Sequence, residues 1–107
     1  MLFLQLEELA KAVYENVRKM NGPVERESYG IDMNKMTARM VRAYLAFAGG
    51  EINRESCLRT LKSDLNFVKR QMKLVTDLKI WQPKVCARLG NIVIQIQEII
   101  EREEKIA

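Results

Sequence analysis

The stretch Leu58–Val75, LRTLKSDLNFVKRQMKLV, decides the fold of this 107-residue chain. Its apolar side chains recur at alternating steps of three and four residues, which places them on one face of an α-helix. A helix with one apolar face buries that face against other helices, so the stretch indicates a helical core. The members of this apolar seam are Leu58, Leu61, Leu65, Val68, Met72 and Val75.

Glycine and proline are scarce, and they separate this stretch from three others with the same helical spacing. The four expected helices span about residues 2–21, 24–48, 53–80 and 83–105. Joints of roughly 2 to 5 residues favour antiparallel neighbours. The sequence therefore predicts a single domain over residues 1–107, an all-α, up-down-up-down four-helix bundle.

Local signals at the joints agree with this periodicity. Asn53 is a favoured N-cap residue and is expected to start the third helix. Gly30 lies inside the second expected helix and indicates either a late start or a kink. Trp81 lies next to Pro83 at the last joint, and we expect its ring to close one end of the bundle.

The composition excludes several classes of chemistry. The chain has no histidine, which removes His-activated nucleophiles and His-ligated metal sites. Cys57 and Cys86 are its two cysteines, and their spacing forms no C-x-x-C pair. No apolar run approaches the roughly 18 to 20 residues of a membrane span. We therefore expect a cytoplasmic, non-enzymatic protein with reduced thiols, no catalytic residue, no cofactor and no metal.

The net charge is 18 − 14 = +4, and the third expected helix and its flanks carry the excess. Its basic side chains form a stripe beside the apolar seam, and the second helix adds a shorter basic line that includes Lys35. Few carboxylates follow at i,i+4, so these cations indicate a phosphate-binding surface, although an ordinary solvated face is the alternative. The candidate nucleic-acid- or polymerase-binding residues are Lys69, Arg70, Lys73, Lys62, Arg59, Arg39 and Arg42.

The third expected helix also carries apolar residues away from its seam. Phe67, Leu74 and Leu78 lie on this second face. One explanation is that the helix sits deep in the bundle with neighbours on two sides. The other is that Phe67, Leu74 and Leu78 form an oligomer interface with a second copy of the chain.

Several runs resemble a known family, that of accessory variability determinants and rRNA intervening-sequence proteins. Pro23–Gly30, PVERESYG, is similar to the start of that family's second helix. Cys57–Leu78 is similar to its third helix, which has a leucine-rich seam and regularly spaced basic residues. The joint Ile80–Pro83 and the pair Leu89-Gly90 also match its last loop and fourth helix in order and spacing. The resemblance covers roughly residues 5–100.

The resemblance implies a homopentamer in which five four-helix bundles form a barrel with a basic surface. In diversity-generating retroelements, the accessory protein binds the reverse transcriptase and its template RNA during mutagenic homing. By position, Lys69 and Lys73 match the basic residues of the family's third helix, and Arg70 lies beside them. Many accessory variability determinants have a glycine-tryptophan pattern at the end of the fourth helix, where this chain has Gln95–Glu98. The branch of the family therefore stays open.

The sequence thus supports a non-catalytic, oligomeric nucleic-acid-binding accessory protein that partners a reverse transcriptase and RNA, with DNA as a further ligand. One alternative is a stand-alone rRNA intervening-sequence-type bundle. Another is a helical assembly or adaptor module without nucleic acid, which accounts for the second apolar face but leaves the charge asymmetry unexplained.

Overall fold

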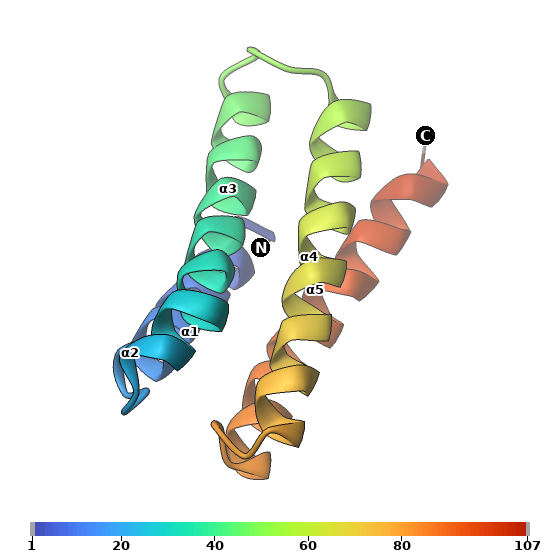
Figure 1. The fold of residues 1–107 in the computed structure, drawn as a ribbon. Coiled ribbons are helices and arrows are strands. Elements are labelled where there is room, and N and C mark those ends of the chain that lie inside the picture. Colours follow the sequence, from blue (N-terminus) through green and yellow to red (C-terminus); the bar gives the residue numbers. More distant parts are fainter. Residues whose placement is uncertain (1, 107) are drawn as a thin grey trace.

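A computed structural model describes residues 2–106, which form antiparallel helical rods with dimensions of 42 × 22 × 19 Å (Figure 1). The first rod packs against the second and fourth, and so does the third, so the first and third lie across the bundle from each other. The all-helical four-helix bundle expected from the sequence is confirmed for these residues. The rods are α1 (Leu2–Arg18), then α2 (Pro23–Glu25) continued by η1 (Arg26–Gly30) and α3 (Ile31–Ala48), then α4 (Arg54–Asp77) and α5 (Pro83–Ile106).

The core consists mainly of the seam residues that the periodicity identifies. In α4 the seam is buried from Leu61 to Val75, whereas Leu58 near its start is half-buried. In α3 the side chains toward the C-terminal end, such as Tyr44 and Phe47, are also only half-buried. The largest fully buried side chains include Leu6, Leu9, Met33, Met40, Leu61, Leu89 and Ile96.

The second rod contains a π-helical turn, η1, where the sequence offered a late start or a kink at Gly30. Such turns add one residue to an otherwise continuous helix. Gly30 is buried against α1, and a Cβ atom there would lie 2.5 Å from Val17 Cγ1. Glycine therefore lets the second rod approach α1 closely at this level.

The C-terminal ends of α3 and α4 share one capping geometry but use different residues. Beyond α3, Gly50 has a φ of 78°, and Glu51 N donates to Ala46 O at 2.8 Å. Beyond α4, Lys79 has a φ of 62°, and Ile80 N donates to Val75 O at 2.9 Å. Both patterns are Schellman motifs, which favour glycine at the left-handed position. This motif ends α4 at Asp77, before the expected residue 80.

Two further local predictions are confirmed. The Asn53 side chain caps α4 by accepting a hydrogen bond from Ser56 N at 2.7 Å. Trp81 is 5% exposed, and its indole Nε1 donates to Asn16 O at 3.3 Å, which joins the α4–α5 turn to α1. The indole closes this end of the bundle. Across residues 2–106, every helix is too short or too polar to cross a membrane.

Candidate nucleic-acid interface

The cations of interest surround α4, which has one edge against α3 and another against α5. Asp64 marks the α3 edge because it binds Arg39 of α3. From Asp64, helical steps of three and four residues lead to Phe67, Gln71, Leu74 and Leu78 on the same edge. Lys62 and Lys69 mark the α5 edge because their side chains reach residues of α5. The solvent-facing ridge between the two edges carries Arg59, Arg70 and Lys73.

Arg39 forms a bidentate ion pair across the α3 edge. Its Nε donates to Asp64 Oδ2 at 2.8 Å, and its Nη2 donates to Asp64 Oδ1 at 2.6 Å. The Asp64 side chain is 2% exposed and that of Arg39 is 52% exposed. Hydrogen bonding and the charge of Asp64 raise the pKa of Arg39 above its ordinary value. Because a buried carboxylate without its partner is costly, Arg39 primarily holds α3 against α4.

The cations on the α5 edge are joined to the C-terminal half of α5. Lys62 Nζ lies 3.3 Å from a Glu104 carboxylate oxygen, and Lys69 Nζ donates to Gln97 Oε1 at 3.4 Å. Arg54, the first residue of α4, pairs with Glu103 at 2.8 Å. The sequence did not identify these partners, because they lie on a different helix.

Two cations of the ridge have carboxylate partners within α4 itself. Arg59 lies 3.1 Å from Glu55, and Lys73 lies 3.0 Å from Asp77. The expectation that i,i+4 partners are mostly missing is therefore wrong for these two residues. All four side chains are more than half exposed, and exposed pairs of this kind contribute only about 1 kcal/mol or less. Arg59 and Lys73 can consequently exchange their partners for phosphate at little cost.

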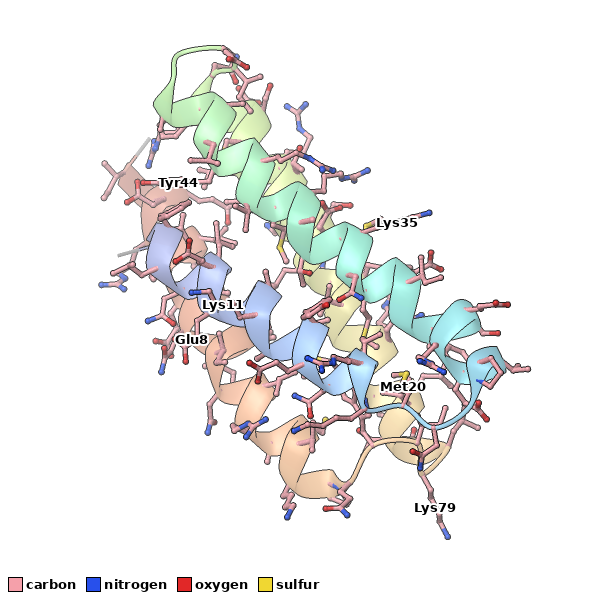
Figure 2. All side chains as sticks on the ribbon, turned by 90° about the vertical axis from the view of Figure 1, so that its left-hand side faces the viewer. Glu8, Lys11, Met20, Lys35, Tyr44 and Lys79 are labelled. Atoms are coloured by element: carbon pink, nitrogen blue, oxygen red, sulfur yellow. The ribbon has the colours of Figure 1, made fainter. Side chains whose placement is uncertain are left out.

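Three basic residues around the α3 edge make no ion pair within residues 2–106. Lys35 and Arg42 lie one turn to either side of Arg39 on α3, and Arg70 lies on the ridge of α4. All three are exposed, and Figure 2 shows Lys35 projecting from α3. Lys69 is also free of an ion pair among the described residues, because it bonds there to the neutral amide of Gln97. Among the basic residues of α3 and α4, these four are the ones most available to an anionic partner.

The second apolar face of α4 is open in this chain. Phe67 is 37% exposed, Leu74 is 39% exposed and Leu78 is 51% exposed. α3 runs alongside this edge but does not cover these three side chains. Of the two explanations from the sequence, deep burial between neighbours within one chain does not hold. Packing against a second copy stays a prediction.

The charge of this part of the molecule suits the attraction of anions. Residues 31–79 contain ten basic and five acidic side chains, a balance of 10 − 5 = +5, while the other residues sum to −1. Within the described part of the chain, no three His, Cys, Asp or Glu side chains gather as metal ligands would. A convex basic surface beside an apolar strip can bind a polyanion, an acidic protein surface or both.

Comparison with known proteins gave no match to a family model, to a curated protein or to a solved structure.

Proposed function

We propose that this chain is a non-catalytic, self-associating accessory protein that holds RNA by its phosphates and works with a reverse transcriptase. The observation that carries the proposal is the group of unpaired cations around α3 and α4, namely Lys35, Arg42 and Arg70. The family resemblance of the sequence supplies the polymerase and template RNA as partners. Lys69 and Lys73 match the basic positions of that family and extend the same surface.

The mechanism is electrostatic. Lysine and arginine side chains displace counterions from the nucleic-acid backbone, so affinity falls steeply as salt rises. One chain has a modest charge of +4, but five copies in a ring carry 5 × 4 = +20. Self-association therefore multiplies a weak attraction into a useful one. No aromatic side chain alternates with the basic residues, so contact with phosphates rather than base stacking is expected.

The contact set follows from the ion pairs. Lys35, Arg42, Arg70, Lys69 and Lys73 are the proposed phosphate contacts, because none of them holds a buried partner. Arg59 and Lys62 contribute less, since Lys62 also ties α4 to α5. Arg39 has a structural role through Asp64.

The test compares two triple variants of equal charge. Lys35→Ala/Arg42→Ala/Arg70→Ala removes cations near the α3 edge, and Arg18→Ala/Lys84→Ala/Arg88→Ala removes the same residue types elsewhere. Binding of single-stranded RNA is measured by filter retention over a range of salt concentrations. We expect the first triple to reduce the slope of log affinity against log salt by about 2, from roughly 0.7 per phosphate contact, and the second to change it much less.

Two outcomes would overturn this assignment. One is an equal effect of both triples, which would mean that only total charge matters. The other is no RNA binding by the parent chain at low salt. Lys69→Ala/Lys73→Ala gives an independent check, because it should weaken binding without lowering helicity by circular dichroism.

A second candidate function is a helical protein–protein assembly module without nucleic acid. The exposed apolar strip of Phe67, Leu74 and Leu78 favours it, because such strips often mark interfaces. Self-association that persists in a chain without RNA affinity would support this second function.

A further inference from the structure

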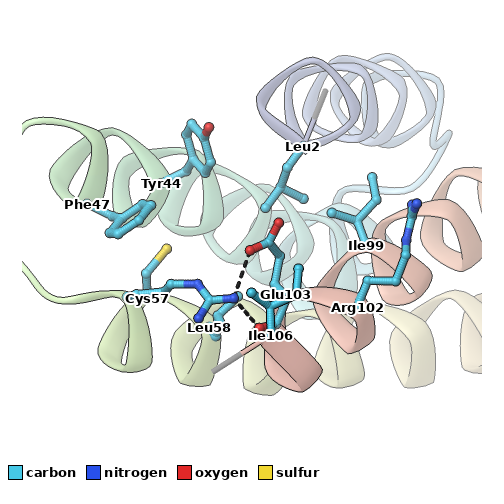
Figure 3. A pocket seen from close by; sticks show the side chains of 10 residues that line it. Leu2, Tyr44, Phe47, Cys57, Leu58, Ile99, Arg102, Glu103 and Ile106 are labelled. Atoms are coloured by element: carbon cyan, nitrogen blue, oxygen red, sulfur yellow. Dashed lines mark hydrogen bonds and ion pairs between the residues drawn. The ribbon is translucent and has the colours of Figure 1, made fainter.

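The two ends of the bundle are closed to different degrees. At one end, Trp81 fills the space between the rods and donates a hydrogen bond to Asn16 O. At the other end, residues of α1, α3, α4 and α5 surround a cavity of about 390 Å³ (Figure 3). Cavities of this order hold small organic molecules in other proteins. The open end is therefore a candidate ligand site that lies apart from the ridge of α4.

The inner surface of this cavity is mostly apolar. Leu2 reaches it from α1, Phe47 from α3, Leu58 from α4 and Ile99 from α5. Figure 3 shows these side chains surrounding a common space. Phe47 of α3 and Leu58 of the α4 seam stay half-buried, because no side chain comparable to Trp81 covers them among residues 2–106. An apolar chain or ring placed there would lose its contact with water.

The polar groups of the cavity favour one negative charge. Arg54 donates to a carboxylate oxygen of Glu103 at 2.8 Å and to the backbone carbonyl of the same residue. Arg102 also lines the cavity and makes no ion pair within residues 2–106. Two guanidinium groups against one carboxylate leave a balance of 2 − 1 = +1. Guanidinium binds carboxylate with two parallel hydrogen bonds, so Arg102 is suited to a carboxylate ligand.

We propose that this cavity binds a single-chain monocarboxylate, such as a medium-chain fatty acid. The apolar chain lies between Leu2, Phe47 and Leu58, and the carboxylate lies at Arg102. A cationic amphiphile is disfavoured because it would meet Arg54 and Arg102. The cavity shares no lining residue with the proposed phosphate contacts.

Cys57 provides a reporter inside the cavity. It lines the apolar wall, it is 2% exposed, and burial raises the pKa of its thiol. The thiolate is the reactive form, so alkylation of Cys57 is expected to be slow. Cys86 is half-exposed on α5, is not among the residues lining this cavity, and serves as an internal control.

The experiment uses decanoate as the probe, with decanol and decyltrimethylammonium as neutral and cationic analogues. Iodoacetamide modification of each cysteine is followed by peptide mass spectrometry, and binding is measured by calorimetry below the micellar range. We expect decanoate to slow alkylation at Cys57 but not at Cys86. Arg102→Ala should weaken decanoate binding about 10-fold while leaving decanol unchanged, because a charge-assisted hydrogen bond is lost.

Two control variants keep the result decisive. Leu58→Trp fills the cavity and should abolish decanoate binding, and circular dichroism verifies that it folds. Arg88→Ala removes the same charge from α5 outside the cavity and should leave binding unchanged. The proposal fails if decanoate does not bind, if both cysteines are protected equally, or if Arg102→Ala and Arg88→Ala behave alike.

Discussion

The two edges of α4 are stabilised in opposite ways. Along the α5 edge, exposed polar side chains bridge the helices, with Lys62 on Glu104 and Lys69 on Gln97. Along the α3 edge, one arginine binds the buried carboxylate of Asp64, and the apolar side chains of Phe67 and Leu74 face solvent. One helix thus has a polar, bridged edge and an apolar, open edge.

The difference separates cations that hold the fold from cations that can bind a partner. A pair between exposed groups contributes little to stability, because water and salt screen it. A pair that includes a buried carboxylate cannot be broken without leaving that charge in a poor environment. The partner that each basic side chain meets, rather than its residue type, therefore determines its role.

The largest effect is expected at the buried pair. Arg39→Ala removes the only hydrogen-bonding partner that the Asp64 side chain has within residues 2–106, so the melting temperature should fall by about 10 °C or more. Lys62→Ala at the opposite edge breaks an exposed pair and should change the melting temperature by only about 2 °C or less. Thermal unfolding followed by circular dichroism compares the two variants.

A double variant separates the loss of the pair from a loss of packing. Arg39→Met/Asp64→Leu replaces both charges by apolar groups and should recover most of the lost stability. Equal melting temperatures for Arg39→Ala and Lys62→Ala would contradict the distinction between the two edges.

Self-association tests the open edge. Phe67→Glu/Leu74→Glu places two charges in the apolar strip, so the association constant should fall at least about 10-fold with little change in thermal stability. Sedimentation velocity over a range of concentrations measures this. Leu4→Glu/Ile94→Glu is the control of equal charge, because Leu4 is 64% exposed, Ile94 is 52% exposed and both lie on other rods. A parent chain that is monomeric at every concentration would contradict the proposed interface between copies.

The smallest effect is expected at the turns that follow the C-terminal ends of α3 and α4. Lys79→Gly relieves a left-handed backbone conformation and should stabilise the fold by about 1 kcal/mol. Gly50→Ala should destabilise it by a similar amount, because a Cβ there meets no other atom and only the φ of 78° matters. Urea unfolding measures both. A destabilised Lys79→Gly variant would show that the lysine side chain has a stabilising role at this turn.

Most of the fold was predictable because helical periodicity is a local property. In α1, apolar residues at helical spacing from Leu6 to Val17 are buried, and most of the α4 seam is buried as its spacing indicates. Asp64 was the missed residue. It lies three residues after Leu61 and four before Val68, which is the spacing of the buried seam. This spacing indicated that Asp64 is buried, but charged residues are usually exposed.

The candidate site was harder to predict because its chemistry depends on partners far apart in sequence. Glu104 lies 42 residues from Lys62, and Arg39 lies 25 residues from Asp64. No pattern within one helix fixes which of these groups meet. The open end was missed for a related reason, since its walls come from the ends of helices whose packing is decided only in the assembled bundle.

The position of the open end has a consequence for experiments with fusions. Leu2 and Ile106 line the same cavity, so both ends of the described chain emerge there. A purification tag on either end would lie beside the proposed ligand site and compete with the ligand for the cavity. A circular permutant that joins these ends through a linker and opens at the Lys79–Gln82 turn would move both new termini to the opposite side of the molecule.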